Sequence, residues 1–138
     1  ILPKKRNIGF NYKEAPGTKG KTKYFNKGDN SIMYEKMNKL VRDNIPNIIE
    51  QTGDKPDFVI LDSNDYYTEL KKKLTEEVNE FNDSDAIIEL CDVVEIISAI
   101  LDYKNIGGEE FEKMRCAKIK ANGKFEKRIF LNGVDRML

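Results

Sequence analysis

The stretch ELKKKLTEEVNEFNDSDAIIELCDVVEIISAIL, residues 69–101, decides the fold because two helical patterns follow one another in it. Starting two residues earlier, spacings of three and four residues define one seam: Tyr67, Leu70, Leu74, Glu77 and Phe81. Four of these side chains are apolar, as a buried helix face requires. Burying an unpaired carboxylate costs roughly several kcal/mol, so the sequence raises the question of what Glu77 contacts.

The rest of the chain after residue 38 is also mostly helical in pattern. Residues 40–53 predict a short helix with Pro46 in its first turn and Gly53 at its end. Residues 63–82, 85–104 and 109–121 predict three longer helices, the first capped by Asp62 or Ser63 and the second by Asp83 or Ser84. Residues 58–61 predict a brief extended piece. Short connections favour antiparallel neighbours, so we expect an all-α fold, an antiparallel helical bundle, with an extended C-terminal tail at 124–131.

Residues 1–32 differ from the rest in charge. They carry eight basic and two acidic side chains, a net charge of +6, and the whole chain is neutral, so residues 33–138 carry −6. We therefore expect a basic N-terminal appendage over 1–32, irregular or with a β-hairpin that joins residues 8–12 to 22–25, and a helical domain over 33–138. The stretch APGTKGKT (15–22) resembles a phosphate loop but lacks the preceding buried strand and the following helix. Docking on acidic surfaces explains the charge at least as well as nucleic acid, which we do not expect as a partner.

Composition excludes several kinds of chemistry. The chain has no histidine, so Ser-His and Cys-His nucleophile pairs, histidine general bases and histidine zinc sites are excluded. Its two cysteines, Cys91 and Cys116, do not form a disulfide framework, and we expect Cys91 in the core and a reducing, cytoplasmic setting. No apolar run approaches the roughly 18 residues of a membrane span.

Carboxylates recur on both helices of the opening stretch. Glu77 and Glu80 are three residues apart, as are Glu89 and Asp92, so each pair shares one helix face. Glu89 and Asp92 fall among core-type isoleucines. Four clustered carboxylates repel one another, and they can protonate, pair with buried lysine or arginine, or bind a cation. An all-oxygen site favours Mg²⁺, with Mn²⁺ as the next choice.

The alternative is that these acids form a solvated stripe with partners such as Lys73, and we expect Lys71–Lys73 to be solvated. If a metal site exists, basic side chains must meet the phosphates that complete the shell of Mg²⁺. The candidates outside the acidic helices are Lys39, Arg42, Lys118, Lys127 and Arg128.

These motifs resemble a known family. EEVNE (76–80), followed after eight residues by ELCD (89–92), is similar to the Glu-Glu-x-x-Glu … Glu-x-x-Asp signature of the MazG-like all-α nucleoside triphosphate pyrophosphohydrolases. Together with NKLVRDNIP (38–46) and GKFEKRIFL (123–131), the pattern resembles the phosphoribosyl-ATP pyrophosphohydrolase-like branch. The resemblance covers residues 37–131 and does not extend to residues 1–32.

The resemblance implies a function and a set of site residues. It implies metal ligation by Glu77, Glu80, Glu89 and Asp92, with Glu76 as a further ligand or as the base that orients water. It implies phosphate contacts from Lys39, Arg42, Lys118 and Arg128, and more weakly from Lys127. The family uses Mg²⁺ and an activated water to split a nucleoside triphosphate into monophosphate and pyrophosphate, sometimes as a house-cleaning activity, and its members are homodimers or homotetramers. Phosphoribosyl-ATP hydrolysis in histidine biosynthesis and a non-catalytic helical interaction module are the two alternatives.

Overall fold

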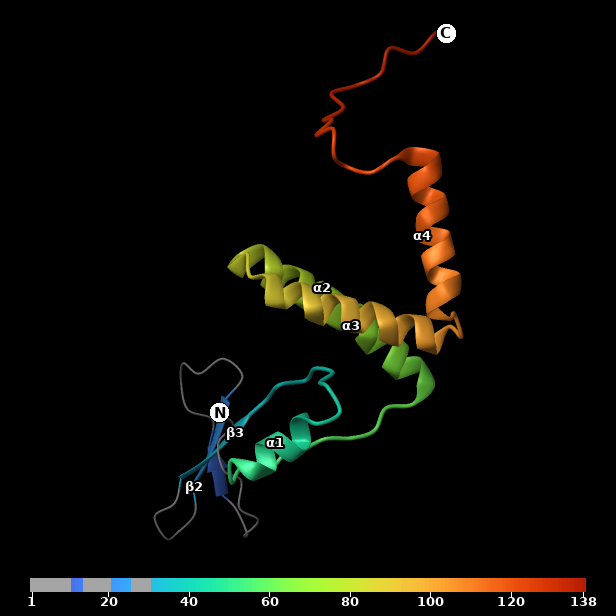
Figure 1. Cartoon of the computed structure of the whole chain (residues 1–138). Coiled ribbons are helices and arrows are strands. Elements are labelled where there is room, and N and C mark those ends of the chain that lie inside the picture. Colours follow the sequence, from blue (N-terminus) through green and yellow to red (C-terminus); the bar gives the residue numbers. More distant parts are fainter. Residues whose placement is uncertain (1–10, 14–20, 26–30) are drawn as a thin grey trace.

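The structure, a computed structural model, describes residues 11–13, 21–25 and 31–138. Three short strands precede four helices in the chain (Figure 1). The strands are β1 (Asn11–Lys13), β2 (Lys21–Phe25) and β3 (Ser31–Glu35). The helices are α1 (Ile45–Gln51), α2 (Ser63–Ser84), α3 (Ile87–Tyr103) and α4 (Gly108–Asn122). The described chain is thus mostly helical, as the sequence predicts.

The three strands form one antiparallel sheet in the order β1-β2-β3. β1 pairs with β2 in the region where the hairpin is expected, whereas β3, which runs across the expected boundary at residue 32, is not predicted by the sequence. Most of the basic appendage, including residues 15–20 of the APGTKGKT stretch, lies outside the described residues. The hydroxyl of Tyr34 in β3 donates a 2.9 Å hydrogen bond to Asp57, which links the sheet to the segment after α1.

α1 is shorter than expected. It begins at Ile45, with Pro46 in its first turn, where the missing N–H of proline costs no helical hydrogen bond. Gly53 follows it with a φ of 85°, the left-handed conformation that glycine adopts without strain. The preceding residues 36–44 are not helical, and residues 57–61 form neither helix nor strand.

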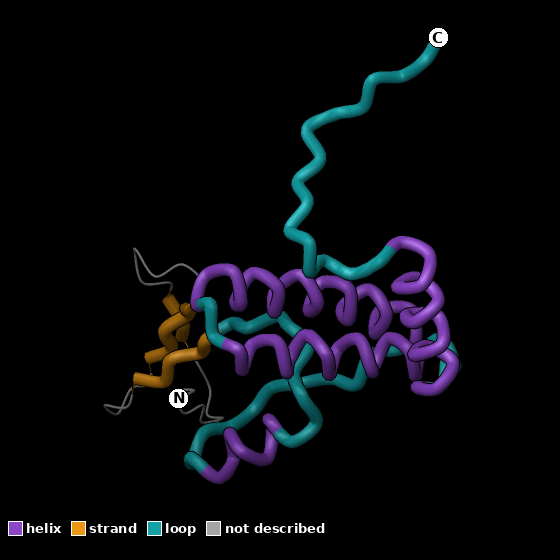
Figure 2. Tube along the Cα trace, turned by 45° about the horizontal axis from the view of Figure 1, so that its top comes forward, coloured by secondary structure: helices purple, strands orange, loops and turns teal. Residues whose placement is uncertain are grey.

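α2 and α3 form an antiparallel hairpin, and they lie side by side in both ribbon views (Figures 1 and 2). The carboxylate of Asp62 caps α2 by accepting a 2.8 Å hydrogen bond from the Asp65 N–H, as the sequence predicts. The predicted cap of α3 is wrong. α2 continues to Ser84, Asp85 reverses the chain with a φ of 56°, and the N-cap of α3 is Ala86 without a side-chain hydrogen bond.

The core of the hairpin follows the predicted seam. Leu70 and Glu77 are the two buried residues of α2, and Ile96 is the buried residue of α3. At one end of the hairpin, the rings of Tyr67 and Tyr103 meet edge to face with centroids 4.7 Å apart. This contact shows which residues of the two antiparallel helices face each other at this end.

α4 leaves the end of α3 and projects away from the hairpin, with the tail continuing beyond it (Figure 1). The tail forms a turn in which the Arg128 N–H donates to the Phe125 carbonyl, and no strand is assigned in residues 123–138. Cys91 is exposed, so its predicted core position is wrong. Among the described residues, no helix combines the length and apolar character needed to cross a membrane.

Candidate metal centre

The register of the hairpin brings the acidic positions of α2 and α3 together. Tyr67 faces Tyr103, so a residue ten positions later in α2 faces one about ten positions earlier in α3. Glu77 therefore meets Asp92, and Glu80 lies one turn further on, beside Glu89. The sequence pattern predicted two carboxylate pairs on facing helices, and the antiparallel packing brings three of these four carboxylates together.

Three of the four predicted ligands converge. One carboxylate oxygen from each of Glu77, Glu89 and Asp92 lies within 4.8 Å of the others, with Glu77 buried and the other two half-buried. In an octahedral Mg²⁺ shell with bonds of about 2.1 Å, ligand oxygens are roughly 3 to 4 Å apart. The limit of 4.8 Å is wider than that range, so the three oxygens would have to move closer together to hold an ion, and an all-oxygen donor set is the kind that a hard divalent ion prefers. Glu80 is exposed and stands outside this trio.

Lys73 occupies the α2 side of the cluster. Its Nζ lies 2.8 Å from Glu77 Oε1 and 3.1 Å from Glu76 Oε1, one turn along the helix. Its side chain is only 16% exposed, so the expectation that Lys73 is solvated is wrong. Burial lowers the pKa of Lys73, but the hydrogen bonds to Glu77 and Glu76 outweigh it and leave the pKa raised. This ammonium is the contact that makes the buried Glu77 tolerable.

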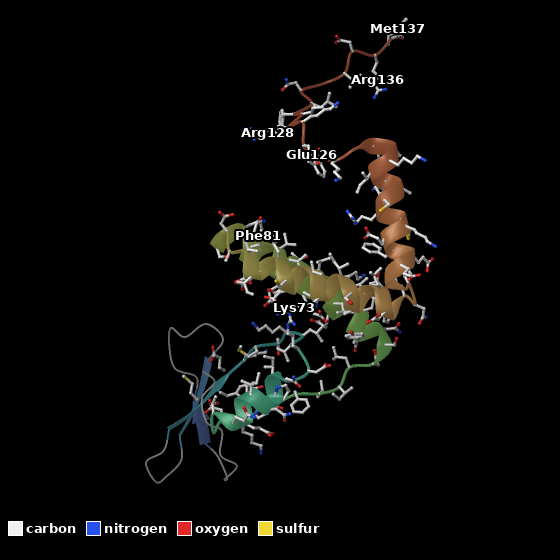
Figure 3. All side chains as sticks on the ribbon, viewed as in Figure 1. Lys73, Phe81, Glu126, Arg128, Arg136 and Met137 are labelled. Atoms are coloured by element: carbon white, nitrogen blue, oxygen red, sulfur yellow. The ribbon has the colours of Figure 1, made fainter. Side chains whose placement is uncertain are left out.

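Two more cations reach the cluster from the segment between β3 and α1. Arg42 donates a 2.6 Å hydrogen bond to Asp92, and this bond raises the pKa of the guanidinium. Lys39 lies 3.3 Å from Glu76. Both residues were named as candidate phosphate contacts, and the structure brings both to the carboxylate cluster. The segment that carries them passes beneath the hairpin near Lys73 (Figure 3).

The acids of the cluster differ in how they hold a proton. Burial raises the pKa of Glu76, but its ion pairs with Lys73 and Lys39 together lower the pKa by more than burial raises it. The net pKa is therefore below the ordinary value, and the carboxylate stays ionised. Partial burial and the nearby charges of Glu80, Asp92 and Glu77 raise the pKa of Glu89. Among these three charges, that of Glu80 has the largest effect on Glu89. Glu80 therefore lies close to the trio, although it is not one of its members.

The other predicted phosphate contacts lie elsewhere in the chain. Lys118 is on the exposed surface of α4, and Lys127 and Arg128 are on the exposed tail. In Figure 3, Arg128 lies beyond the far end of α4, well away from Lys73. A single copy of the chain therefore brings Lys39 and Arg42 to the carboxylates but not these three. The sequence analysis named Lys73 as a partner of these acids within the alternative of a solvated stripe, and the spacing of three and four residues from Glu76 and Glu77 carried that signal, but it did not predict that Lys73 is buried.

Searches with models of protein families, against curated proteins and against solved structures found no match. The resemblance to the MazG-like family therefore rests on the sequence motifs.

Proposed function

We propose that the chain is a Mg²⁺-dependent nucleotide pyrophosphohydrolase of the MazG-like type, which releases pyrophosphate from a nucleoside triphosphate. The observation that supports this most is the convergence of the Glu77, Glu89 and Asp92 oxygens within 4.8 Å around a buried side chain. Hard divalent ions select such all-oxygen sites, and Mn²⁺ fits the same donors. A bound ion there would neutralise phosphate charge and activate the attacking water.

The residues around the trio divide into two roles. Glu77, Glu89 and Asp92 would hold the ion, with Glu80 completing the set after a change of its side-chain rotamer. Glu76 stays ionised between two lysines, so it suits a ligand or water-orienting role better than that of a strong proton acceptor. Arg42 and Lys39 already contact the cluster and would turn from carboxylates to phosphates when substrate binds.

The proposed assembly is a homodimer or homotetramer, because the described part of one copy does not form a closed bundle. The proposed location is the cytoplasm. α4 contacts α3 near their junction and leaves the hairpin open on its other faces. A second copy would supply the missing layer of an antiparallel helical bundle.

The test is pyrophosphate release from a panel of ribo- and deoxyribonucleoside triphosphates and phosphoribosyl-ATP, with Mg²⁺ and with excess chelator. We expect Mg²⁺-dependent release that Glu80→Gln abolishes, while Glu69→Gln, whose partner Lys72 is an exposed neighbour at 3.0 Å, retains it. Turnover that persists in chelator would contradict the proposal. Preference for phosphoribosyl-ATP over every triphosphate would assign the histidine-biosynthesis activity instead.

A second candidate is a non-catalytic helical interaction module. The ion pairs Lys73–Glu77 and Arg42–Asp92 favour it, since two of the four predicted ligands already have cationic partners. It predicts that neither Mg²⁺ nor Mg²⁺ with nucleotide changes the melting temperature. The enzymatic proposal predicts a rise that Asp92→Asn removes.

A further inference from the structure

The dipeptide Asn-Gly occurs at two places, as Asn122-Gly123 at the end of α4 and as Asn132-Gly133 in the tail. In this dipeptide the backbone nitrogen of the glycine attacks the side-chain amide of the asparagine with little hindrance. Glycine has no Cβ to obstruct the approach, and its backbone turns freely. The two dipeptides are identical but lie in different surroundings, so the structure predicts different reactivity.

The helix holds Asn122-Gly123 in an unreactive arrangement. Asn122 is the last residue of α4, and the Gly123 N–H donates a 2.7 Å hydrogen bond to the Ile119 carbonyl. This bond engages the nitrogen that would attack and restrains the backbone on both sides of it. The last turn of α4 must therefore open before the glycine nitrogen reaches the side chain.

Asn132-Gly133 lies in the open tail. Both residues are exposed and belong to neither a helix nor a strand. A Cβ atom placed on Gly133 would meet nothing within 4 Å, and no hydrogen bond within the described part of the chain engages its N–H. Figure 3 shows Arg128 and Arg136, which bracket the dipeptide in sequence, on the tail that extends past α4. The glycine nitrogen here is free to approach the asparagine side chain.

We propose that Asn132 is a site of spontaneous deamidation, whereas Asn122 is protected while α4 is folded. The Gly133 nitrogen loses its proton to solvent and bonds to Cγ of Asn132, the bond from Cγ to the side-chain nitrogen breaks, and ammonia leaves. Water then opens the succinimide ring at either carbonyl and gives aspartate or isoaspartate. One water enters and one ammonia leaves, so the reaction needs no oxidant, metal or enzyme. The inference does not depend on the proposed function.

The modification would place a negative charge in an apolar part of the tail. Phe130 and Leu131 on one side of the dipeptide are 86% and 72% exposed, and Val134 on the other side is 56% exposed. Residues 124–138 carry four basic and two acidic side chains, so the net charge of the tail would fall from +2 to +1. Burial of an unpaired charge is costly, so the product opposes packing of this segment against an apolar surface.

The test is incubation of the folded protein in mildly alkaline buffer, followed by cleavage after glutamate and mass spectrometry. This cleavage puts the two sites on separate peptides, residues 113–126 and 127–138, each with a single asparagine. The conversion of amide to carboxyl is then assigned to one residue without ambiguity. We expect Asn132 to react about two- to tenfold faster than Asn122, the factor that one backbone hydrogen bond contributes.

Two controls separate the effect of structure from that of sequence. In guanidinium chloride α4 unfolds, and the two sites should react at similar rates because the dipeptide is the same. Gly133→Ala should slow the reaction at Asn132 and leave Asn122 unchanged. The added Cβ obstructs ring closure but fits the open space at this position.

Three outcomes would overturn the proposal. Equal rates in the folded protein would contradict protection by α4. A slow reaction at Asn132 that becomes fast in guanidinium chloride would mean that the tail is covered in solution, so that Asn132 is not the open site. A difference between the two sites that persists in guanidinium chloride would trace the selectivity to neighbouring residues and not to the fold.

Discussion

Replacing Lys73 with methionine tests whether the carboxylate cluster takes a metal ion. Lys73 contacts Glu77 at 2.8 Å and Glu76 at 3.1 Å. At an effective dielectric near 20, one such contact is worth about 5 kcal/mol before the cost of desolvation. Loss of one partner of a buried pair costs about 3–5 kcal/mol, and an exposed pair contributes about 0–1 kcal/mol. Lys73 is nearly buried but Glu76 is 31% exposed, so we expect Lys73→Met to destabilise the metal-free protein by about 2 kcal/mol.

Added metal should reverse part of this loss. A divalent ion supplies the positive charge that Lys73→Met removes, and it no longer competes with the ammonium for Glu77. Saturating Mg²⁺ or Mn²⁺ should therefore stabilise the variant by about 1 kcal/mol more than the parent, which corresponds to roughly fivefold tighter binding. Urea unfolding with chelator and with each ion measures the difference.

The control for this experiment is Lys72→Met. Lys72 pairs with Glu69 at 3.0 Å, but its side chain is 68% exposed, so its removal should cost less than about 0.5 kcal/mol at any metal concentration. If Lys73→Met lost the same stability with and without metal, the ion would not enter the cluster. The Lys73–Glu77 contact would then be a structural ion pair, and the enzymatic proposal would lose its main support.

Three further predictions address the same hairpin. The pKa of Glu89 is higher in the folded chain than its ordinary 4.5 because of partial burial and then the charges of Glu80, Asp92 and Glu77. As pH rises above 4.5, the unfolded chain loses this proton first, so the metal-free protein loses stability through that window while its Mn²⁺ affinity rises. Calorimetry across this pH range should show both the loss of stability and the rise in Mn²⁺ affinity. The stability of Glu89→Gln should vary less with pH. Asp62→Ala, which removes the α2 cap, should cost about 1 kcal/mol in urea unfolding and leave Mn²⁺ affinity unchanged. A double-mutant cycle of Tyr67→Leu and Tyr103→Leu should give a coupling of about 0.5–1.5 kcal/mol, and its absence would mean that this contact does not fix the register.

Local signals in the sequence were enough to predict the helices. The seam that contains Leu70 and Glu77 follows the helical period, and the burial of both residues follows from it. The cap at Asp62 and the position of Pro46 likewise depend on side chains acting on their own neighbours. The convergence of the acids needed one more step, the antiparallel return of α3, which the short break after residue 82 made predictable.

Features that depend on distant contacts were not predictable. β3 pairs with β2 through backbone groups, and its sequence SIMYE carries no strong strand pattern. The outward course of α4 depends on the loop at residues 104–107 and not on the helix itself. Cys91 lies in a mostly apolar run whose apolar residues are spread over several faces of the helix, so the run gives no clear sign of which face turns inward. Ile87, Leu90 and Val94 of the same run are also exposed, although their apolar character suggested burial.

The charges around Glu77 distinguish a structural ion-pair network from a metal site. Three cations, Lys39, Arg42 and Lys73, contact the cluster. It holds five carboxylates, those of Glu76, Glu77, Glu80, Glu89 and Asp92, so its net charge is −2. An unmatched buried carboxylate lowers stability, but the buried acid of the cluster, Glu77, is paired with Lys73, so the excess negative charge lies on half-buried and exposed acids. The excess equals the charge of one divalent cation, and the charges of Glu80, Asp92 and Glu77 add to the effect of partial burial in raising the pKa of Glu89. Under the enzymatic proposal, Glu77 is one ligand of an ion whose charge the three cations only partly replace.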